Sequence, residues 1–336
     1  RLGAVALMVV AMLVTPLILH ESIREGAMGM MFPIYAIPVV GVALVVWAVV
    51  TRGFPARKRH ISLVVAIAIA CGMWVLLRTD GMTGSAGAEL RWRWSKTSEE
   101  LLLSESSDEP QGIAGRSAAA RTGAEWPGFR GPDRNGIVPG IRIARDWANS
   151  PPVELWRKPI GPGWSSFAVG DGLVYTQEQR GEEEVVSCYS AATGDLVWRH
   201  ADAARFWESN AGAGPRGTPT LHQGRVYSCG GTGILNVLDA GDGSVVWSRN
   251  AAVDTGATTP DWGFASSPLV VDDLVIVAAS GSLIAYDLAT GEPRWSGPTG
   301  GVSYSSPHMS SFEGIYQVLL LRDAGVIGVA PADGRF

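Results

Sequence analysis

One eleven-residue stretch recurs along this chain and limits what the chain can fold into. It reads Cys188-Tyr-Ser-Ala-Ala-Thr-Gly-Asp-Leu-Val-Trp198, and it returns as Val237–Trp247 and as Ala285–Trp295. A fourth copy begins at Gly328, and the sequence stops at Phe336 before the Trp that would complete the motif. We therefore expect a repeat protein, and we expect this chain to be a fragment of a longer one.

The spacing of the motif predicts the size of the repeating unit. Roughly 40 to 50 residues separate successive copies, which is the period of a four-stranded propeller blade. The copies are aligned on Gly194, Gly243, Gly291 and Gly334. Within each copy, short alternating runs are separated by Asp-Gly, Asp-Asp or Thr-Gly, residue pairs that suit the tight turns of β-hairpins. The predicted fold is a partial all-β propeller of about four four-stranded blades, preceded by an α-helical transmembrane anchor of three helices.

The terminal Trp of each motif is interpreted as structural. A blade alone cannot bury both faces of its sheet, so a large side chain on the outer strand can seal the seam with the next blade. The preceding glycine supplies a turn. The predicted structural residues are Gly194, Trp198, Gly243, Trp247, Gly291 and Trp295.

Residues 1–78 have the composition of a membrane segment. The apolar runs 2–20, 31–50 and 61–78 contain no charged residue within the part that would cross the bilayer, and each is long enough to do so. The loop 51–60 carries four Lys or Arg residues, whereas 21–30 has one Arg and two Glu. The positive-inside rule then places 51–60 in the cytoplasm and everything after Arg78 on the far side. We expect an anchor in the bacterial inner membrane, with the propeller in the periplasm.

Residues 79–124 are predicted to be a juxtamembrane segment and linker. A short strand is followed by a helix from about Ser98 to Glu105, because Thr97 and Glu100 have the spacing of a capping box. Trp92 and Trp94 suit either the membrane interface or the surface of the folded domain, and these alternatives remain open.

The repeat region is assigned to 125–336, and it begins with Trp126-Pro-Gly-Phe-Arg-Gly-Pro-Asp-Arg-Asn-Gly136. This stretch is too rich in turn residues for a regular element. We expect it to pin the linker onto the folded domain with Trp126 and Phe129 as plugs. Arg130 and Arg134 are able to meet an anion there, but the stretch is a weak ligand-site candidate.

The motif Asp-x-x-Thr-Gly-x-x-x-Trp, complete at Asp287–Trp295, resembles the tryptophan-docking motif of pyrroloquinoline-quinone-like (PQQ-like) propeller repeats. That family includes quinoprotein dehydrogenases and the propeller lipoprotein of the outer-membrane β-barrel assembly machinery. The resemblance covers about Glu125 to the end, and it implies the fold more strongly than the function. For a dehydrogenase it implies pyrroloquinoline quinone, Ca²⁺, a catalytic Asp and, in many members, two adjacent cysteines. The sequence has no adjacent cysteines, and no catalytic or metal residue can be assigned.

Candidate ligand residues stand where each innermost strand begins, because these strands line the axial channel of a propeller. Small hydroxyl residues recur there, at Ser166, Thr218, Ser267 and Ser306, with aromatic residues and one cation just before them. The candidate cofactor-binding set is Trp164, Arg216, Thr218, Trp262 and Tyr304. An anionic quinone is able to stack on the aromatics and pair with the arginine. The favoured alternative is that the hydroxyls satisfy backbone groups and the aromatics fill the channel mouth.

The remaining polar residues give weaker signals. Glu178 and Arg180, in the first repeat, are interpreted as a solvated surface pair, and the lone His222 and His308 as satisfied histidines. Cys188 and Cys229 either form a disulfide or, as we favour, remain buried free thiols. A net charge of −5 gives no indication of nucleic-acid binding.

Two functions from different classes fit these features. The favoured one is a non-catalytic, membrane-anchored binding or scaffold module that presents its channel mouth to an envelope protein. The alternative is a pyrroloquinoline-quinone-dependent dehydrogenase of sugars or alcohols linked to the membrane electron chain.

Overall fold

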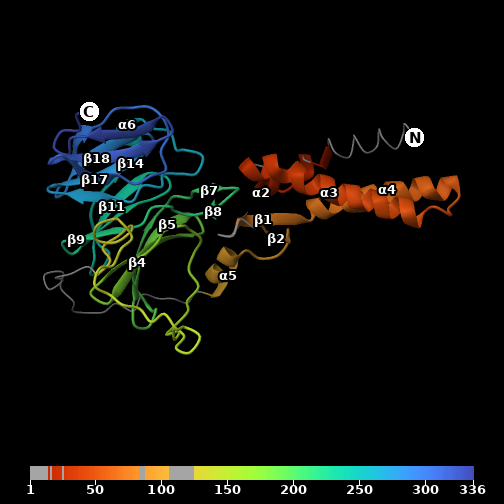
Figure 1. The fold of residues 1–336 in the computed structure, drawn as a ribbon, viewed down its shortest axis with the longest axis horizontal. Helices are drawn as coiled ribbons and strands as arrows, with labels where there is room; N and C mark the ends of the chain where they lie inside the picture. The colour runs from red at the N-terminus through yellow and green to blue at the C-terminus, as the bar shows by residue number, and fades with distance from the viewer. Residues whose placement is uncertain (1–13, 16, 25, 83–87, 106–124) are drawn as a thin grey trace. The chain divides into compact units, whose positions relative to one another are not determined.

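The computed structural model describes residues 14, 15, 17–24, 26–82, 88–105 and 125–336. The chain divides into two compact units, each treated by itself (Figure 1). The first comprises Arg1–Thr97 and Trp207–Gly212, and the second comprises Ser98–Phe206 and Ala213–Phe336.

The first unit is built from helices and a β-hairpin. Its described helices are α2 (Glu21–Arg24), α3 (Gly26–Val50) and α4 (Ala56–Val75), and its strands include β1 (Leu77–Met82) and β2 (Ala88–Trp92). Among the described residues, α4 is the one helix both long and apolar enough to cross a membrane, and Ala36–Val50 is a shorter apolar helix. The predicted span 2–20 falls largely outside the described residues. A three-helix anchor therefore remains a prediction.

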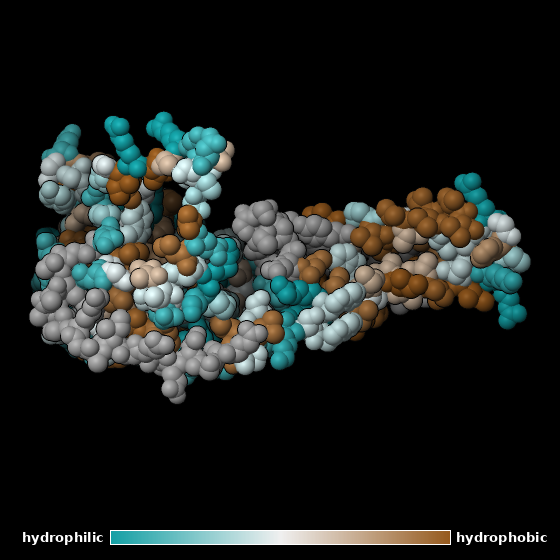
Figure 2. All heavy atoms as spheres, turned by 90° about the horizontal axis from the view of Figure 1, so that it is seen from below, coloured by the Kyte–Doolittle hydropathy of each residue, from teal (hydrophilic) through white to brown (hydrophobic). Residues whose placement is uncertain are grey.

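Apolar side chains cover the outside of α3 and α4 (Figure 2). Val45 and Val50 of α3 and Ile69 of α4 are each more than half exposed. The indole nitrogen of Trp47 donates a hydrogen bond of 2.9 Å to the hydroxyl of Ser62, which ties the two helices together. Apolar residues thus face outward, as they do in helices surrounded by lipid.

The third predicted span ends earlier than expected. Residues 61–78 read as one apolar run, but α4 stops at Val75 and β1 follows from Leu77. The carboxylate of Asp80 lies 3.3 Å from the guanidinium of Arg78 and 3.1 Å from that of Arg91 across the hairpin. Residues 81 and 82, at the start of the predicted juxtamembrane segment and linker, are the end of strand β1, which pairs with β2.

The second unit contains successive antiparallel sheets in meander order, an arrangement consistent with part of a β-propeller. We call them blades 1 to 4. Blade 1 has strands β3 (Ala168–Gly170), β4 (Leu173–Arg180), β5 (Glu183–Ser190) and β6 (Leu196–Asp202); blade 2 has β9 (Thr220–His222), β10 (Arg225–Cys229), β11 (Ile234–Asp239) and β12 (Val245–Asn250). Blade 3 has β13 (Leu269–Val271), β14 (Leu274–Ala279), β15 (Ser282–Asp287) and β16 (Pro293–Ser296); blade 4 has β17 (His308–Phe312), β18 (Ile315–Arg322) and β19 (Gly325–Val329).

Two short elements lie outside these meanders. The ribbon of β7 (Trp207–Glu208) and β8 (Gly212–Ala213) follows blade 1, and helix α6 (Ala251–Thr255) follows blade 2. Both occupy connections between one outer strand and the next inner strand. The described part of the chain therefore has three four-stranded blades and one three-stranded blade, where four of four strands were expected.

Adjacent blades bury aliphatic and aromatic side chains against each other. Three buried clusters lie at the seams between blades 1 and 2, blades 2 and 3, and blades 3 and 4. Tyr175 and Val226 lie at the first seam, Tyr227 and Val275 at the second, and Ile276 and Leu320 at the third. The alternation of the strands explains this arrangement, since successive residues point to opposite faces of a blade.

Each motif tryptophan lies on the motif glycine of the following blade. The pairs are Trp198 on Gly243, Trp247 on Gly291 and Trp295 on Gly334, and a Cβ atom on any of these glycines would fall 2.5–2.6 Å from a ring carbon. The indole nitrogens donate hydrogen bonds of 2.9–3.2 Å to backbone carbonyls of that same blade. The glycine thus provides both the left-handed turn and the space for the ring.

A further tryptophan docks in the same way without belonging to a described blade. Trp156 lies over Gly194 of blade 1 and donates a 2.9 Å hydrogen bond to the carbonyl of Ala191. The sequence search missed it because Val153-Glu-Leu-Trp156 has no Thr-Gly before it. Segment 153–157 therefore presents its tryptophan to blade 1 as an outer strand does.

Helix α5 (Ser98–Glu105) occupies the place that the capping-box spacing predicts. The Glu99 carboxylate accepts a 2.8 Å hydrogen bond from the backbone nitrogen of Gly181 and bonds of 2.9 and 3.0 Å from Arg205. A bidentate carboxylate and guanidinium pair is among the stronger polar contacts. Within the second unit, α5 is thus held on blade 1.

Candidate functional site

The inner ends of the blades are linked by a chain of hydroxyl groups. The hydroxyl of Thr218 accepts from the backbone nitrogen of Ser166 at 3.1 Å, and that of Ser267 accepts from the nitrogen of Thr218 at 2.9 Å. Ser306 continues the series, because its hydroxyl accepts from the nitrogen of Ser267 at 2.9 Å. Three of the four recurring hydroxyls thus accept from a backbone nitrogen of the preceding blade, as the favoured alternative predicts, whereas Ser166 takes part through its backbone nitrogen.

Thr218, one of the five candidate cofactor-binding residues, is therefore a link between blades. Its side chain is only 2% exposed. The other four lie in the connections that lead into the inner strands.

The aromatic candidates stand at the surface around this inner end. Trp164 and Trp262 are each 51% exposed, and the rings of Trp262 and Tyr304 are in contact with their centroids 4.8 Å apart. The backbone nitrogen of Trp164 donates a 2.9 Å hydrogen bond to the carbonyl of Pro215, next to Arg216. The structure thus brings Trp262 and Tyr304 into contact and places Trp164 beside the segment that carries Arg216.

The stretch from Trp126 to Gly136, which we call the clasp, runs across the inner strands of three blades. Trp126 forms a β-bridge with Val169 of blade 1, and the carbonyl of Pro127 accepts a 2.6 Å hydrogen bond from Leu221 of blade 2. Arg134 reaches blade 3, where its guanidinium donates to the carbonyls of Ser267 and Pro268 at 3.2 and 2.9 Å. These contacts show that the stretch itself is attached to the folded domain, while the linker that it was expected to pin, residues 106–124, lies outside the described residues.

The two expected plugs differ in their environment. Trp126 is half-buried, and its ring lies against Gly131, where a Cβ atom would be 2.6 Å away. Phe129 is 38% exposed and lines two cavities. Only Trp126 is enclosed as a plug would be, because the turn at Gly131 folds the clasp over its ring.

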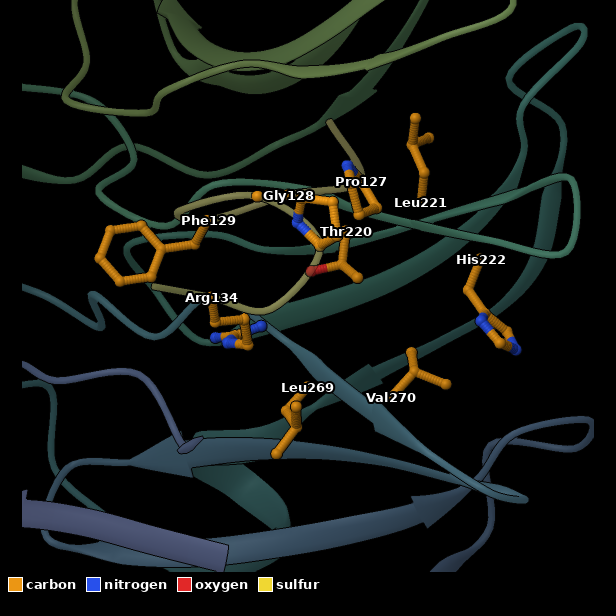
Figure 3. A pocket seen from close by; sticks show the side chains of 11 residues that line it. Pro127, Gly128, Phe129, Arg134, Thr220, Leu221, His222, Leu269 and Val270 are labelled. Atoms are coloured by element: carbon orange, nitrogen blue, oxygen red, sulfur yellow. The ribbon is translucent and has the colours of Figure 1, made fainter. Parts of the chain in front are cut away.

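The smaller cavity, of about 150 Å³, lies between the clasp and the inner strands of blades 2 and 3. Figure 3 shows Arg134 beside Thr220 and facing Leu269, with His222 and Val270 on the far side. Burial lowers the pKa of His222, so the neutral imidazole is favoured there. This space is a packing gap beneath the clasp.

The larger cavity has a volume of about 510 Å³ and collects the cationic residues of this region. Its lining comprises Phe129, Arg130, Arg134, Arg216, Ala265, Ser267, Tyr304, Ser305, Ser306, Pro307 and His308. Two of the five candidate residues, Arg216 and Tyr304, thus share one cavity. Arg130, Arg134 and His308, to which the sequence gives little weight, line it with them.

Each arginine of this cavity contacts a neutral group. Arg130 donates a 3.0 Å hydrogen bond to the carbonyl of Asn135, and the guanidinium of Arg216 lies 5.2 Å from the ring centroid of Phe206. Burial lowers the pKa of Arg134 to about 10, because the charged guanidinium loses part of its hydration. The cavity thus brings three guanidinium groups to one lining.

Glu178 and Arg180 form a buried network instead of the expected solvated pair. Glu178 is fully buried, and its carboxylate accepts bonds of 2.5 and 2.6 Å from the hydroxyls of Ser187 and Tyr189, while Arg180 lies 3.3 Å away. Burial acts to raise the pKa of Glu178, but the charge of Arg180 and these hydrogen bonds outweigh it and lower that pKa. The surface interpretation was wrong, because the face of β4 that carries both residues is covered by the segment around Gly161, whose backbone nitrogen also donates to Glu178.

The cysteines are not bonded to each other. Cys188 and Cys229, in blades 1 and 2, form no disulfide, and both are buried. Burial raises the pKa of Cys229 to about 12, so its thiolate is strongly disfavoured.

Comparison with known proteins supports the predicted family of the repeats. Residues 182–336 match the family model described as outer membrane protein assembly factor BamB. Residues 182–336 are PQQ-like propeller repeats. The resemblance drawn from the tryptophan motif is confirmed over this part of the chain, and the docked Trp and Gly pairs are its structural basis.

Two curated relatives of different function are similar to this chain. The outer membrane protein assembly factor BamB of Shewanella oneidensis is 29% identical over 155 residues, which is 43% of this chain and 36% of the relative. The quinohemoprotein alcohol dehydrogenase ADH-IIG of Pseudomonas putida is 31% identical over 137 residues, 38% of this chain and 18% of the relative. The chain thus spans about a third or less of the length of these relatives.

Among solved structures, the quinohemoprotein alcohol dehydrogenase of Comamonas testosteroni is similar with a TM-score of 0.44 and 20% identity. The likeness covers 66% of this chain and 41% of that one.

Proposed function

We propose that this protein is a membrane-anchored PQQ-like propeller that acts in the periplasm as a non-catalytic binding or scaffold module for an envelope protein. The observation that carries the proposal is the exposure of Trp164 and Trp262, each 51%, around the inner ends of the blades. Exposed tryptophans are enriched at the energetic centres of protein interfaces. The similarity to an outer membrane assembly factor supports an envelope protein as the partner.

Anchoring and orientation rest on the amino-terminal residues. Helix α4 has the length and composition to cross a bilayer, and the basic segment 51–60 leads into it and supplies its first five residues, Ala56 to His60. Alkaline phosphatase, which is active only outside the cytoplasm, tests the orientation when fused within the loop 51–60 or after position 336. Activity of the second fusion alone is expected, and activity of the first alone would reverse the proposed topology.

Partner binding is tested in cells with a photo-crosslinking amino acid at position 262. The matched control places the same amino acid at Val245, which is 50% exposed on the outer strand β12 of blade 2. We expect a discrete adduct with an envelope protein from position 262 and not from position 245. Equal labelling at both positions would show that the aromatic rim is no binding surface.

A dehydrogenase is the second candidate, favoured by the similarity to a quinohemoprotein alcohol dehydrogenase. Tyr304, Arg216 and the other arginines of the large cavity suit an anionic, planar quinone. The described residues fit the Ca²⁺ of such an enzyme less well than they fit the quinone. Among them, no group of three or more His, Cys, Asp or Glu side chains is placed to hold an ion.

Titration of the full chain with pyrroloquinoline quinone and Ca²⁺ separates the two functions. Cofactor fluorescence reports binding, and dye reduction with sugars or alcohols reports turnover. Saturable binding with turnover would favour the dehydrogenase over the scaffold. No binding and no turnover would remove the dehydrogenase.

A further inference from the structure

The β-hairpin of the first unit continues directly from the end of the apolar helix α4 (Figure 1). The helix ends at Val75, and β1 leads away from it from Leu77 onward. Antiparallel pairing returns β2 to the same level, because Trp92 is the register partner of Leu77. The backbone nitrogen of Arg93 then donates a 2.8 Å hydrogen bond to the carbonyl of Leu76. The residues at the end of β2 are thus held beside the last turn of the helix.

Two tryptophans lie at this level with their rings stacked. The ring centroids of Trp92 and Trp94 are 5.4 Å apart, and the ring planes differ by 8°. Their side chains are 44% and 68% exposed. Leu76, and Leu90 on the same face of β2 as Trp92, are 42% and 43% exposed. We call these four residues the exit patch. Large apolar side chains grouped at a surface mark a place of contact with a partner or a membrane.

The length of α4 decides where the exit patch lies when this helix crosses a bilayer. Its first five residues, Ala56 to His60, carry its charges, and its apolar part runs from Ile61 to Val75. That part is about 22 Å long at about 1.5 Å per residue, whereas the hydrocarbon core of a bilayer is about 30 Å thick. The helix is therefore too short to carry its carboxyl end clear of the bilayer. The exit patch, which follows at once, falls in the interfacial layer of that leaflet.

Basic side chains accompany the two tryptophans. Arg93 stands between them, Lys96 follows two residues after the second, and both are exposed. The hairpin carboxylate of Asp80, by contrast, is held between Arg78 and Arg91. Tryptophan collects at the level of the lipid headgroups, and Lys and Arg near a bilayer surface attract acidic lipids. The patch and its cations thus match the two chemical layers of a bilayer interface.

We propose that the exit patch is a lipid-binding anchor in the leaflet where α4 ends. Trp92 and Trp94 insert among the headgroups, and Arg93 and Lys96 contact the phosphates of acidic phospholipids. The inference rests on the proposed membrane anchoring. It assigns the two tryptophans to the membrane and not to the surface of the propeller, because the hairpin register ties them to the end of the helix. Apolar burial and charge together then hold the first residues after the helix at the bilayer surface.

The first experiment identifies what the patch touches. The full chain, with a photo-crosslinking amino acid at position 94, is placed in vesicles of equal parts phosphatidylcholine and phosphatidylglycerol. Mass spectrometry after irradiation distinguishes a lipid adduct from a peptide adduct. Ile69 of α4, 62% exposed, is the matched position for the membrane helix, and Val245 of blade 2, 50% exposed, is the matched position for the propeller. We expect lipid adducts from positions 94 and 69 and none from position 245.

The paired variant Arg93→Gln and Lys96→Gln tests the headgroup contact. One basic residue at an acidic bilayer surface raises the affinity about fivefold. At position 94, adducts with phosphatidylglycerol should therefore exceed those with phosphatidylcholine at least about fivefold. The paired variant should bring the two lipids to within about twofold of each other. Arg142→Gln, at an exposed position in the second unit, is the matched control and should keep the full preference.

The outcomes separate this inference from the anchoring on which it rests. Lipid adducts at position 69 without any at position 94, or peptide adducts of the second unit at position 94, would overturn the lipid anchor and leave the membrane helix in place. Equal lipid labelling at positions 94 and 245 would overturn it as well. A chain without lipid adducts at position 69 would lose the proposed anchoring itself. A paired variant that still prefers phosphatidylglycerol would overturn the headgroup contact.

Discussion

Replacing Gly291 with Ala tests whether the Trp and Gly pairs hold the blades together. Gly291 has φ of +74°, and a Cβ atom there would lie 2.6 Å from Trp247. The left-handed backbone costs an alanine about 1 kcal/mol. Displacing a well-packed ring costs about 1–3 kcal/mol. The lost 3.2 Å bond from the indole to the carbonyl of Leu288 adds about 1 kcal/mol. We expect the free energy of unfolding to fall by about 4 kcal/mol, a large part of the stability of an ordinary domain.

Gly172→Ala is the matched control. Gly172 lies in the turn between β3 and β4 with φ of +73°, and no atom lies within 4 Å of its added Cβ. It carries the backbone strain without the clash, so it should cost only about 1 kcal/mol. Urea unfolding of the full chain in detergent, followed by far-ultraviolet circular dichroism, measures both values.

A double-mutant cycle isolates the contact between the alanine and the ring. In a Trp247→Leu background there is no indole to displace, so Gly291→Ala should cost about 1 kcal/mol, as the control does. Equal costs for Gly291→Ala and Gly172→Ala, or an unchanged cost in the Leu background, would refute the role assigned to the ring.

The remaining predictions concern a newly found seam contact, the hydroxyl chain and acid stability. Trp156→Ala should lower the free energy of unfolding by roughly 2–3 kcal/mol, because its partly exposed ring packs on blade 1. Trp147 is 54% exposed, so Trp147→Ala should change the free energy of unfolding by less than about 0.5 kcal/mol in the same urea assay. Thr218→Val keeps the shape but leaves the nitrogen of Ser166 without its acceptor, so it should cost about 1–3 kcal/mol; no loss would mean that water replaces the hydroxyl. The folded-state pKa of Glu178 is lowered, so its contribution is present above the unfolded pKa of 4.5 and lost as the pH falls through the folded pKa. Glu178→Gln should therefore flatten the loss of stability below about pH 4.5 in acid unfolding curves. Glu184→Gln, where burial raises the pKa, should not flatten it.

The blades were predictable because their signals are local. Residue pairs such as Asp-Gly mark the turns of the hairpins, and the alternation of apolar and polar residues marks the buried face of each strand. The spacing of the repeat shows how often these two signals return along the chain. Ser166, Thr218, Ser267 and Ser306 recur at one position for the same reason, and the chain of bonds between them joins equivalent points of successive blades. Periodicity therefore predicts even this tertiary contact.

The cationic cavity was not predictable, because it has no period. Arg130 and Arg134 lie in a turn-rich stretch that occurs once, and its course across three inner strands depends on contacts with Val169, Leu221 and Pro268. Sequence alone does not show that these arginines meet Arg216. The motif of Trp156 was missed for a related reason, since it lacks the turn that marks the other copies.

Blade 1 shows why an alternating strand can mislead about exposure. The described seams between blades are closed by apolar side chains, but the face of blade 1 that does not meet blade 2 carries Glu178 and Arg180. Segment 156–162 covers this face through directional contacts: the backbone nitrogen of Gly161 donates to Glu178, and that of Gln179 donates 2.8 Å to the carbonyl of Pro162. A Cβ on Gly161 would fall 2.1 Å from the carbonyl oxygen of Gln179, so only glycine allows this approach. Hydrogen bonds are directional, so these contacts require a defined position of the segment on the strand. Protonation of Glu178 would weaken this face alone, so acid should release segment 156–162 before it separates the apolar seams.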